Sequence, residues 1–194
     1  MTMGNVPWFW PGLAISVLLG IVAAARVSRS LAIGRVHAAV LVVAVGIIVS
    51  ATLTPLRVAL TSGAVGSGVC DLSRIGPPSL RDLVGLTDAT LNLVLFAPLG
   101  AAIGLLPRTS QRVALLVVAV AGPFAIETIQ LLAPILARGC QSADVVDNLT
   151  GLVAGLLIGI ALRKVAGDRT AGRSRPGRST DSNAGAGSGD SAES

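Results

Sequence analysis

The chain has 194 residues, of which 52% are hydrophobic and only 13% are charged. An average soluble protein carries roughly 25% charged residues, and the mean hydropathy of this chain is +0.77. Length and composition together exclude a soluble globular domain and an array of several domains. The 23 glycines follow no three-residue repeat, which excludes collagen.

Five stretches of the sequence are apolar enough to cross a bilayer as helices. A hydrocarbon core about 30 Å thick needs about 20 helical residues. The stretches lie at 8–25, 36–53, 87–106, 113–133 and 143–162. The predicted fold class is therefore all-α, a polytopic membrane bundle of about five transmembrane helices. The longest connection, at 54–86, contains several glycines and a Pro-Pro pair, and we expect a structured or semi-ordered loop there.

The C-terminal segment 168–194 has a different composition from the rest. It consists almost entirely of Gly, Ser, Ala and charged residues. Such a segment cannot bury enough apolar surface to offset the entropy lost on ordering. We therefore expect a transmembrane domain at 1–167 and a disordered tail at 168–194.

Most of the 15 basic residues fall on one side of the predicted membrane. Cytoplasmic loops carry an excess of Lys and Arg, so this side is predicted to be cytoplasmic, with the N-terminus outside and the C-terminus and tail inside. Nucleic-acid binding is not expected, because the basic tail has no aromatic residues for base stacking. The basic residues of this side outside the tail are Arg26, Arg29, Arg35, Arg108, Arg112, Arg163 and Lys164.

Both cysteines of the chain fall on the outer side in this orientation. Cys70 lies in the 54–86 connection, and Cys140 lies just before the last predicted helix. Disulfides form in oxidising compartments outside the cytoplasm, so a Cys70–Cys140 bond is predicted. The alternative is two unrelated thiols. A metal-binding pair is disfavoured, because no His lies nearby.

Polar residues occur near the outer ends of the third, fourth and fifth helices, within about 4–9 Å of the surface by their residue counts. On each helix they are spaced three or four apart, and such residues share a helix face. Polar groups facing lipid are costly, so these faces are predicted to meet in a polar pocket open to the outside, with Arg138 as the nearby cation. The predicted pocket residues are Asp88, Asn92, Glu127, Gln130, Arg138, Asp144, Asp147 and Asn148.

Two structural alternatives remain for these residues. Asp147 and Asn148 are residue types that begin helices, and Glu127 is a residue type that joins helices in a membrane. Small residues also indicate where the helices approach each other closely. Those with regular spacing are Gly100 and Gly104 on the third helix and Gly151, Gly155 and Gly159 on the fifth.

Four motifs follow one another in the region 40–160: Thr52-Leu53-Thr54-Pro55, Asn92-x-x-x-Phe96-x-Pro98-x-Gly100, Glu127-x-x-Gln130, and Arg138 followed by Asp144-x-x-x-Asn148-x-x-Gly151-x-x-x-Gly155. In order and spacing they resemble those of the VanZ-like family. Asp147 is additional to the family pattern. The resemblance implies a bacterial multi-pass inner-membrane protein, and the family's namesake confers low-level resistance to the glycopeptide teicoplanin.

Three functions remain open from the sequence. The first, favoured by the resemblance, is a non-enzymatic envelope protein whose pocket binds a lipid headgroup, a lipid-linked wall precursor or a glycopeptide. The second is an intramembrane enzyme that uses its carboxylates for Mg²⁺ or for acid–base chemistry; the pocket has no Ser-His or Cys-His pair for nucleophilic catalysis. The third is a small transporter with Glu127 as the titrating group, although five helices form no even inverted repeat. Membrane lipids are the expected partners. No metal or other cofactor is predicted, and the oligomeric state is left open.

Overall fold

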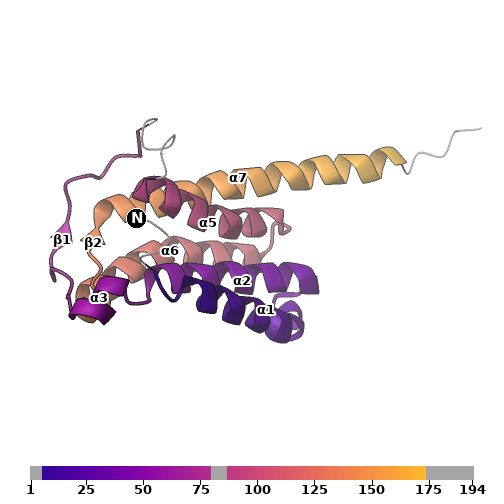
Figure 1. The fold of residues 1–194 in the computed structure, drawn as a ribbon. Coiled ribbons are helices and arrows are strands. Elements are labelled where there is room, and N and C mark those ends of the chain that lie inside the picture. The colour runs from indigo at the N-terminus through magenta and orange to yellow at the C-terminus, as the bar shows by residue number, and fades with distance from the viewer. Residues whose placement is uncertain (1–5, 80–86, 174–194) are drawn as a thin grey trace, which may run out of the picture.

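Five long helices run side by side in the computed structural model, which describes residues 6–79 and 87–173, without the side chains of 167–173 (Figure 1). All five are long and apolar enough to cross a membrane, the last over Ser142–Ala166. This helical architecture is that of a multi-pass membrane protein. The helices are α1 (Phe9–Leu31), α2 (Arg35–Thr52), α5 (Asp88–Leu105), α6 (Ser110–Leu132) and α7 (Ser142–Arg173).

The predicted helices are all present, but two of them are longer than predicted. α1 continues to Leu31 and α7 continues to Arg173. An apolar run ends where the hydrocarbon core ends, whereas helical hydrogen bonding continues through charged residues in water. The first part of the predicted tail, 168–173, is consequently helical. The remainder, 174–194, lies outside the described residues.

Short turns connect the helices at one end of the bundle and longer segments connect them at the other (Figure 1). The turn end carries the α1–α2 and α5–α6 connections. The loop end carries α3 (Arg57–Ser62), β1 (Cys70–Asp71), the 3₁₀ turn η2 (Pro134–Leu136) and β2 (Cys140–Gln141). β1 and β2 pair in parallel, with Cys70 opposite Cys140. The 54–86 connection is thus structured over the part that is described, while 80–86 lie outside it.

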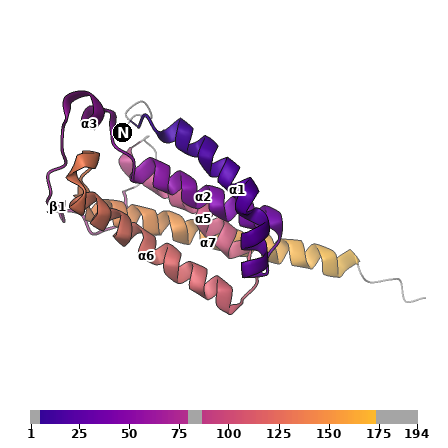
Figure 2. The same cartoon turned by 90° about the horizontal axis from the view of Figure 1, so that it is seen from below.

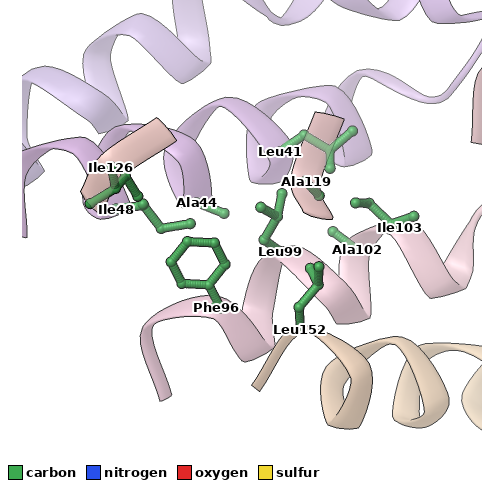
Figure 3. Close-up of a cluster of buried hydrophobic side chains, with 10 residues drawn as sticks. All are labelled: Leu41, Ala44, Ile48, Phe96, Leu99, Ala102, Ile103, Ala119, Ile126 and Leu152. Atoms are coloured by element: carbon green, nitrogen blue, oxygen red, sulfur yellow. The ribbon is translucent and has the colours of Figure 1, made fainter. Parts of the chain in front are cut away.

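The buried core lies between α2, α5, α6 and α7 (Figure 3). Phe96 of α5 is only 1% exposed, and Leu41 and Ile48 of α2, Ile126 of α6 and Leu152 of α7 belong to the same cluster. α1 contributes no buried residue to this cluster, although its last residue, Leu31, packs against it, and α1 lies at the edge of the bundle against α2 (Figures 1 and 2). The four inner helices therefore form the framework of the bundle.

α5 and α7 are in backbone contact along their length, and the five glycines predicted for helix packing all lie in this contact. An added Cβ at Gly100 or Gly104 would meet backbone atoms of α7, and one at Gly151, Gly155 or Gly159 would meet backbone atoms of α5. Only glycine lets two helix backbones approach this closely. The contact holds α5 and α7 at a fixed distance from each other.

α1 and α2 use a related contact that the sequence analysis missed. An added Cβ at Gly12 of α1 would overlap Ser50 of α2, and one at Gly46 of α2 would overlap Ser16 of α1. Each serine hydroxyl donates to a carbonyl one turn back in its own helix, Ser16 to Gly12 and Ser50 to Gly46. The hydroxyls are thereby satisfied inside a close apolar contact.

Candidate ligand pocket at the loop end

A cavity of about 140 Å³ lies at the loop end, between the ends of α2, α5, α6 and α7. Thr52 and Gln141 also contribute polar groups to its wall, and Phe9 and Leu95 contribute apolar ones. The structure brings seven of the eight predicted pocket residues to this wall, which are Asp88, Asn92, Glu127, Gln130, Arg138, Asp144 and Asn148. That these residues bind a ligand stays a prediction.

The carboxylates of the pocket are held by hydrogen bonds from neighbouring elements. The amide nitrogen of Asn92 on α5 donates to Asp144 of α7 over 2.7 Å. The backbone N–H of Gln141 in β2 donates to Oε2 of Glu127 on α6, also over 2.7 Å. Glu127 itself is only 5% exposed. These bonds fix the two carboxylates and link α5 to α7 and α6 to β2.

Two further side chains bind carbonyls at the end of α2. The helix stops at Thr52, because Pro55 has no N–H to continue helical bonding and disfavours helical geometry in the residue before it. Nε2 of Gln130 donates to the carbonyl of Thr52 over 3.0 Å, and Nε of Arg138 donates to the carbonyl of Thr54 over 2.9 Å. The Thr52–Pro55 motif therefore supplies acceptors that orient the Gln130 and Arg138 side chains.

Arg138 is a buried cation beside two carboxylates. Within the described residues it forms no ion pair within 4.0 Å with Glu127 or Asp144. The segment between α6 and α7, in which Arg138 lies, directs the guanidinium toward the carbonyl of Thr54 instead. Burial lowers the pKa of Arg138 to about 10, while the charges of Asp144 and Glu127 act in the opposite direction. The guanidinium therefore stays protonated at neutral pH.

Asp147 does not line the cavity, contrary to the prediction. It is fully buried and forms an ion pair with Arg74 of the 54–86 connection between α2 and α5, which we call the long loop. The physical reason is helix rotation: at 3.6 residues per turn, Asp147 is displaced about 100° from Asn148, although both lie at a similar depth. Asp147 thus anchors the loop. Arg74 was missed, although it is a basic residue on the same predicted side as this acid.

The long loop is fastened to the start of α7 by three kinds of bond. The predicted disulfide is confirmed, because Cys70 and Cys140 are bonded. The hydroxyl of Ser142 donates to the carbonyl of Arg74 over 2.8 Å. Together with the Arg74–Asp147 ion pair, these bonds fix the position of β2. They therefore also fix the backbone N–H of Gln141, which donates to the Glu127 carboxylate.

Three lining side chains have polar atoms without a partner among the described residues. These atoms are Oε1 of Gln130, Nη2 of Arg138 and Oδ1 of Asn148. All three side chains are more than nine-tenths buried. A buried polar group without a partner costs about 1–3 kcal/mol, and native proteins keep few of them. The side chains that line the cavity thus carry one donor and two acceptors that no described residue satisfies.

Within the part of the chain that is described, no group of three or more His, Cys, Asp or Glu side chains is arranged to hold a metal ion. A scan against protein-family models finds no match, and searches of curated proteins and of solved structures find no similar chain. The resemblance to the VanZ-like family therefore stays a prediction from the sequence motifs.

Proposed function

We propose that this protein binds a polar group of an envelope molecule at the outer face of the bacterial plasma membrane, without converting it chemically. The loop end is the outer end in this proposal, with the N-terminus outside. The observation that carries the proposal is that three side chains lining one cavity, Gln130, Arg138 and Asn148, each have a buried polar atom without a partner among the described residues. Such groups are stabilised when a ligand or ordered water completes their hydrogen bonds.

The resemblance to the VanZ-like family gives the proposal a testable biological form. We propose that the protein is a VanZ-like protein and that its pocket contributes to teicoplanin resistance. Expression in a teicoplanin-sensitive bacterial host should then raise the inhibitory concentration of the drug. Glu127→Gln should abolish that increase, because it replaces a carboxyl oxygen in the pocket wall with an amide nitrogen.

The matched control is Ser110→Ala, at the exposed start of α6 at the opposite end of the bundle. This variant should protect as well as the natural chain, and both variants must reach the membrane in equal amounts. Protection by Glu127→Gln at the natural level would count against the pocket. Purified protein that converts a lipid-linked wall precursor would favour the enzyme, and flux in proteoliposomes that Glu127→Gln abolishes would favour the transporter.

A further inference from the structure

A second cavity, of about 440 Å³, lies between α6 and α7. Glu127 and Gln141 line both this cavity and the polar pocket. The remaining wall is mainly apolar and comes from three elements: Phe124, Thr128 and Leu131 of α6, Val145, Val146 and Leu149 of α7, and Leu72 and Ile75 of the long loop. We call this cavity the α6–α7 groove.

The position of the α6–α7 groove selects a hydrocarbon chain as its occupant. Both helical walls belong to segments that are long and apolar enough to span a membrane, and Phe124 in its wall is 54% exposed. Acyl chains are the medium that such a surface meets in a bilayer. Because Glu127 and Gln141 line both cavities, the two are adjacent, and a molecule with a polar head and an apolar chain matches the chemistry of both walls.

The polar pocket selects the chemistry of the head. Its wall has three carboxylates, from Asp88, Glu127 and Asp144, and one guanidinium, from Arg138. A phosphodiester is a strong acceptor for a guanidinium. A primary ammonium has three N–H donors and is attracted by carboxylates. The unpartnered acceptors of Gln130 and Asn148 and the unpartnered donor of Arg138 fit the same two groups.

We infer that the ligand is an amino-phospholipid of the phosphatidylethanolamine type. Its phosphodiester lies against Arg138, its ammonium lies among the carboxylates and amides of the pocket, and one acyl chain lies in the α6–α7 groove. This inference rests on the proposed function and names the class of molecule that the pocket binds.

The headgroup is tested with three lipids that have identical dioleoyl chains. Detergent-purified, delipidated full-length protein is titrated with phosphatidylethanolamine, phosphatidylcholine or phosphatidylglycerol, and bound lipid is measured by native mass spectrometry. Phosphatidylcholine keeps the phosphate and the positive charge but has no N–H donors, and phosphatidylglycerol has no amine. We expect phosphatidylethanolamine to bind at least about tenfold more tightly than either, which corresponds to about 1.4 kcal/mol. Equal affinity for the three lipids would overturn the inference.

The α6–α7 groove is tested with Thr128→Trp, which fills it from an exposed position. The matched control is Val117→Trp, which lies on the same face of α6 by helical spacing and is exposed outside both cavities. Thr128→Trp should lower the affinity for phosphatidylethanolamine, and Val117→Trp should not. Equal affinities of the two variants would refute the chain site.

Soluble glycerophosphoethanolamine separates this inference from the proposed function, because it has the head without the chains. Titration calorimetry should detect its binding to the natural chain and to Thr128→Trp, but not to Glu127→Gln. If it binds while Thr128→Trp leaves lipid affinity unchanged, only the groove assignment fails. If neither the soluble head nor any of the three lipids binds, the inference and lipid-head binding by the pocket fail together.

Discussion

Replacing Gly155 by alanine adds a single methyl group to the contact between α5 and α7. The new Cβ would overlap the carbonyl oxygen of Ala97 and would lie 2.8 Å from the Ala97 carbonyl carbon and 2.9 Å from the backbone nitrogen of Ala101. Carbon atoms in favourable contact are about 3.5–4.0 Å apart. The two helices must therefore separate locally by roughly 1 Å, because backbone atoms cannot turn aside as a flexible side chain can.

The expected loss of stability follows from two opposing effects. Overpacking in a well-packed interior costs about 1–3 kcal/mol. Alanine in place of glycine within a helix returns about 0.5–1 kcal/mol. Because backbone lies on both sides of the contact, we expect the upper part of the first range and a net loss of about 2 kcal/mol. At roughly 2–4 °C per kcal/mol for a chain of this size, the midpoint of thermal unfolding in detergent should fall by about 4–8 °C.

Gly122→Ala is the matched control, because Gly122 is also inside a membrane helix. Its added Cβ would meet only the Cε1 atom of Phe96, at 3.9 Å, which is an ordinary contact. The unfolding midpoint of this variant should be unchanged or higher than that of the natural chain. If Gly155→Ala and Gly122→Ala unfold at the same temperature, the close α5–α7 contact does not contribute as argued.

Three other outcomes are expected. Arg74→Met should destabilise the protein by about 3–5 kcal/mol, because Asp147 keeps a buried charge without its cation. In a double-mutant cycle measured by thermal unfolding, adding Asp147→Leu should recover much of this loss. Purely additive effects of the two substitutions would contradict the prediction. Replacing both cysteines by serine should lower the free energy of unfolding by about 4 kcal/mol, since the disulfide joins positions 70 residues apart. A reducing agent should lower the unfolding midpoint of the natural chain but not that of this variant. With the N-terminus outside, an impermeant maleimide applied to intact cells should label Ser73→Cys and not Ser110→Cys; the reverse pattern would invert the proposed orientation.

Much of the fold could be predicted because a bilayer imposes one length on every span. The apolar runs locate all five helices, and the four-residue spacing of Gly151, Gly155 and Gly159 indicates the α5–α7 contact. The same spacing relates Gly12, Ser16 and Gly20 on α1, so a signal for the α1–α2 contact was also present. Helix ends outside the hydrocarbon core could not be predicted, because water sets no fixed length there.

The pocket was predictable in depth but not in rotation or in loop path. Residue counts from the helix ends place acids and amides in one layer, which is why most of the predicted residues meet at one cavity. The count does not distinguish Asp147 from Asn148, whose side chains point about 100° apart. Arg74 lies in an irregular segment and Gln141 in a strand of only two residues, where no periodicity says which side chain or N–H will reach a helix.

The disulfide also constrains the order in which the protein can be assembled. Cys70 follows α2 in the chain and Cys140 follows α6, so the bond can close only after four helices have been threaded and both cysteines have reached the same compartment. Residue Gln141, whose N–H positions Glu127, is the immediate neighbour of the bonded Cys140. In a chain oriented as proposed, the disulfide would therefore form only in molecules whose helices are inserted with the correct topology. A molecule inserted with another topology would have neither the bond nor a complete binding site.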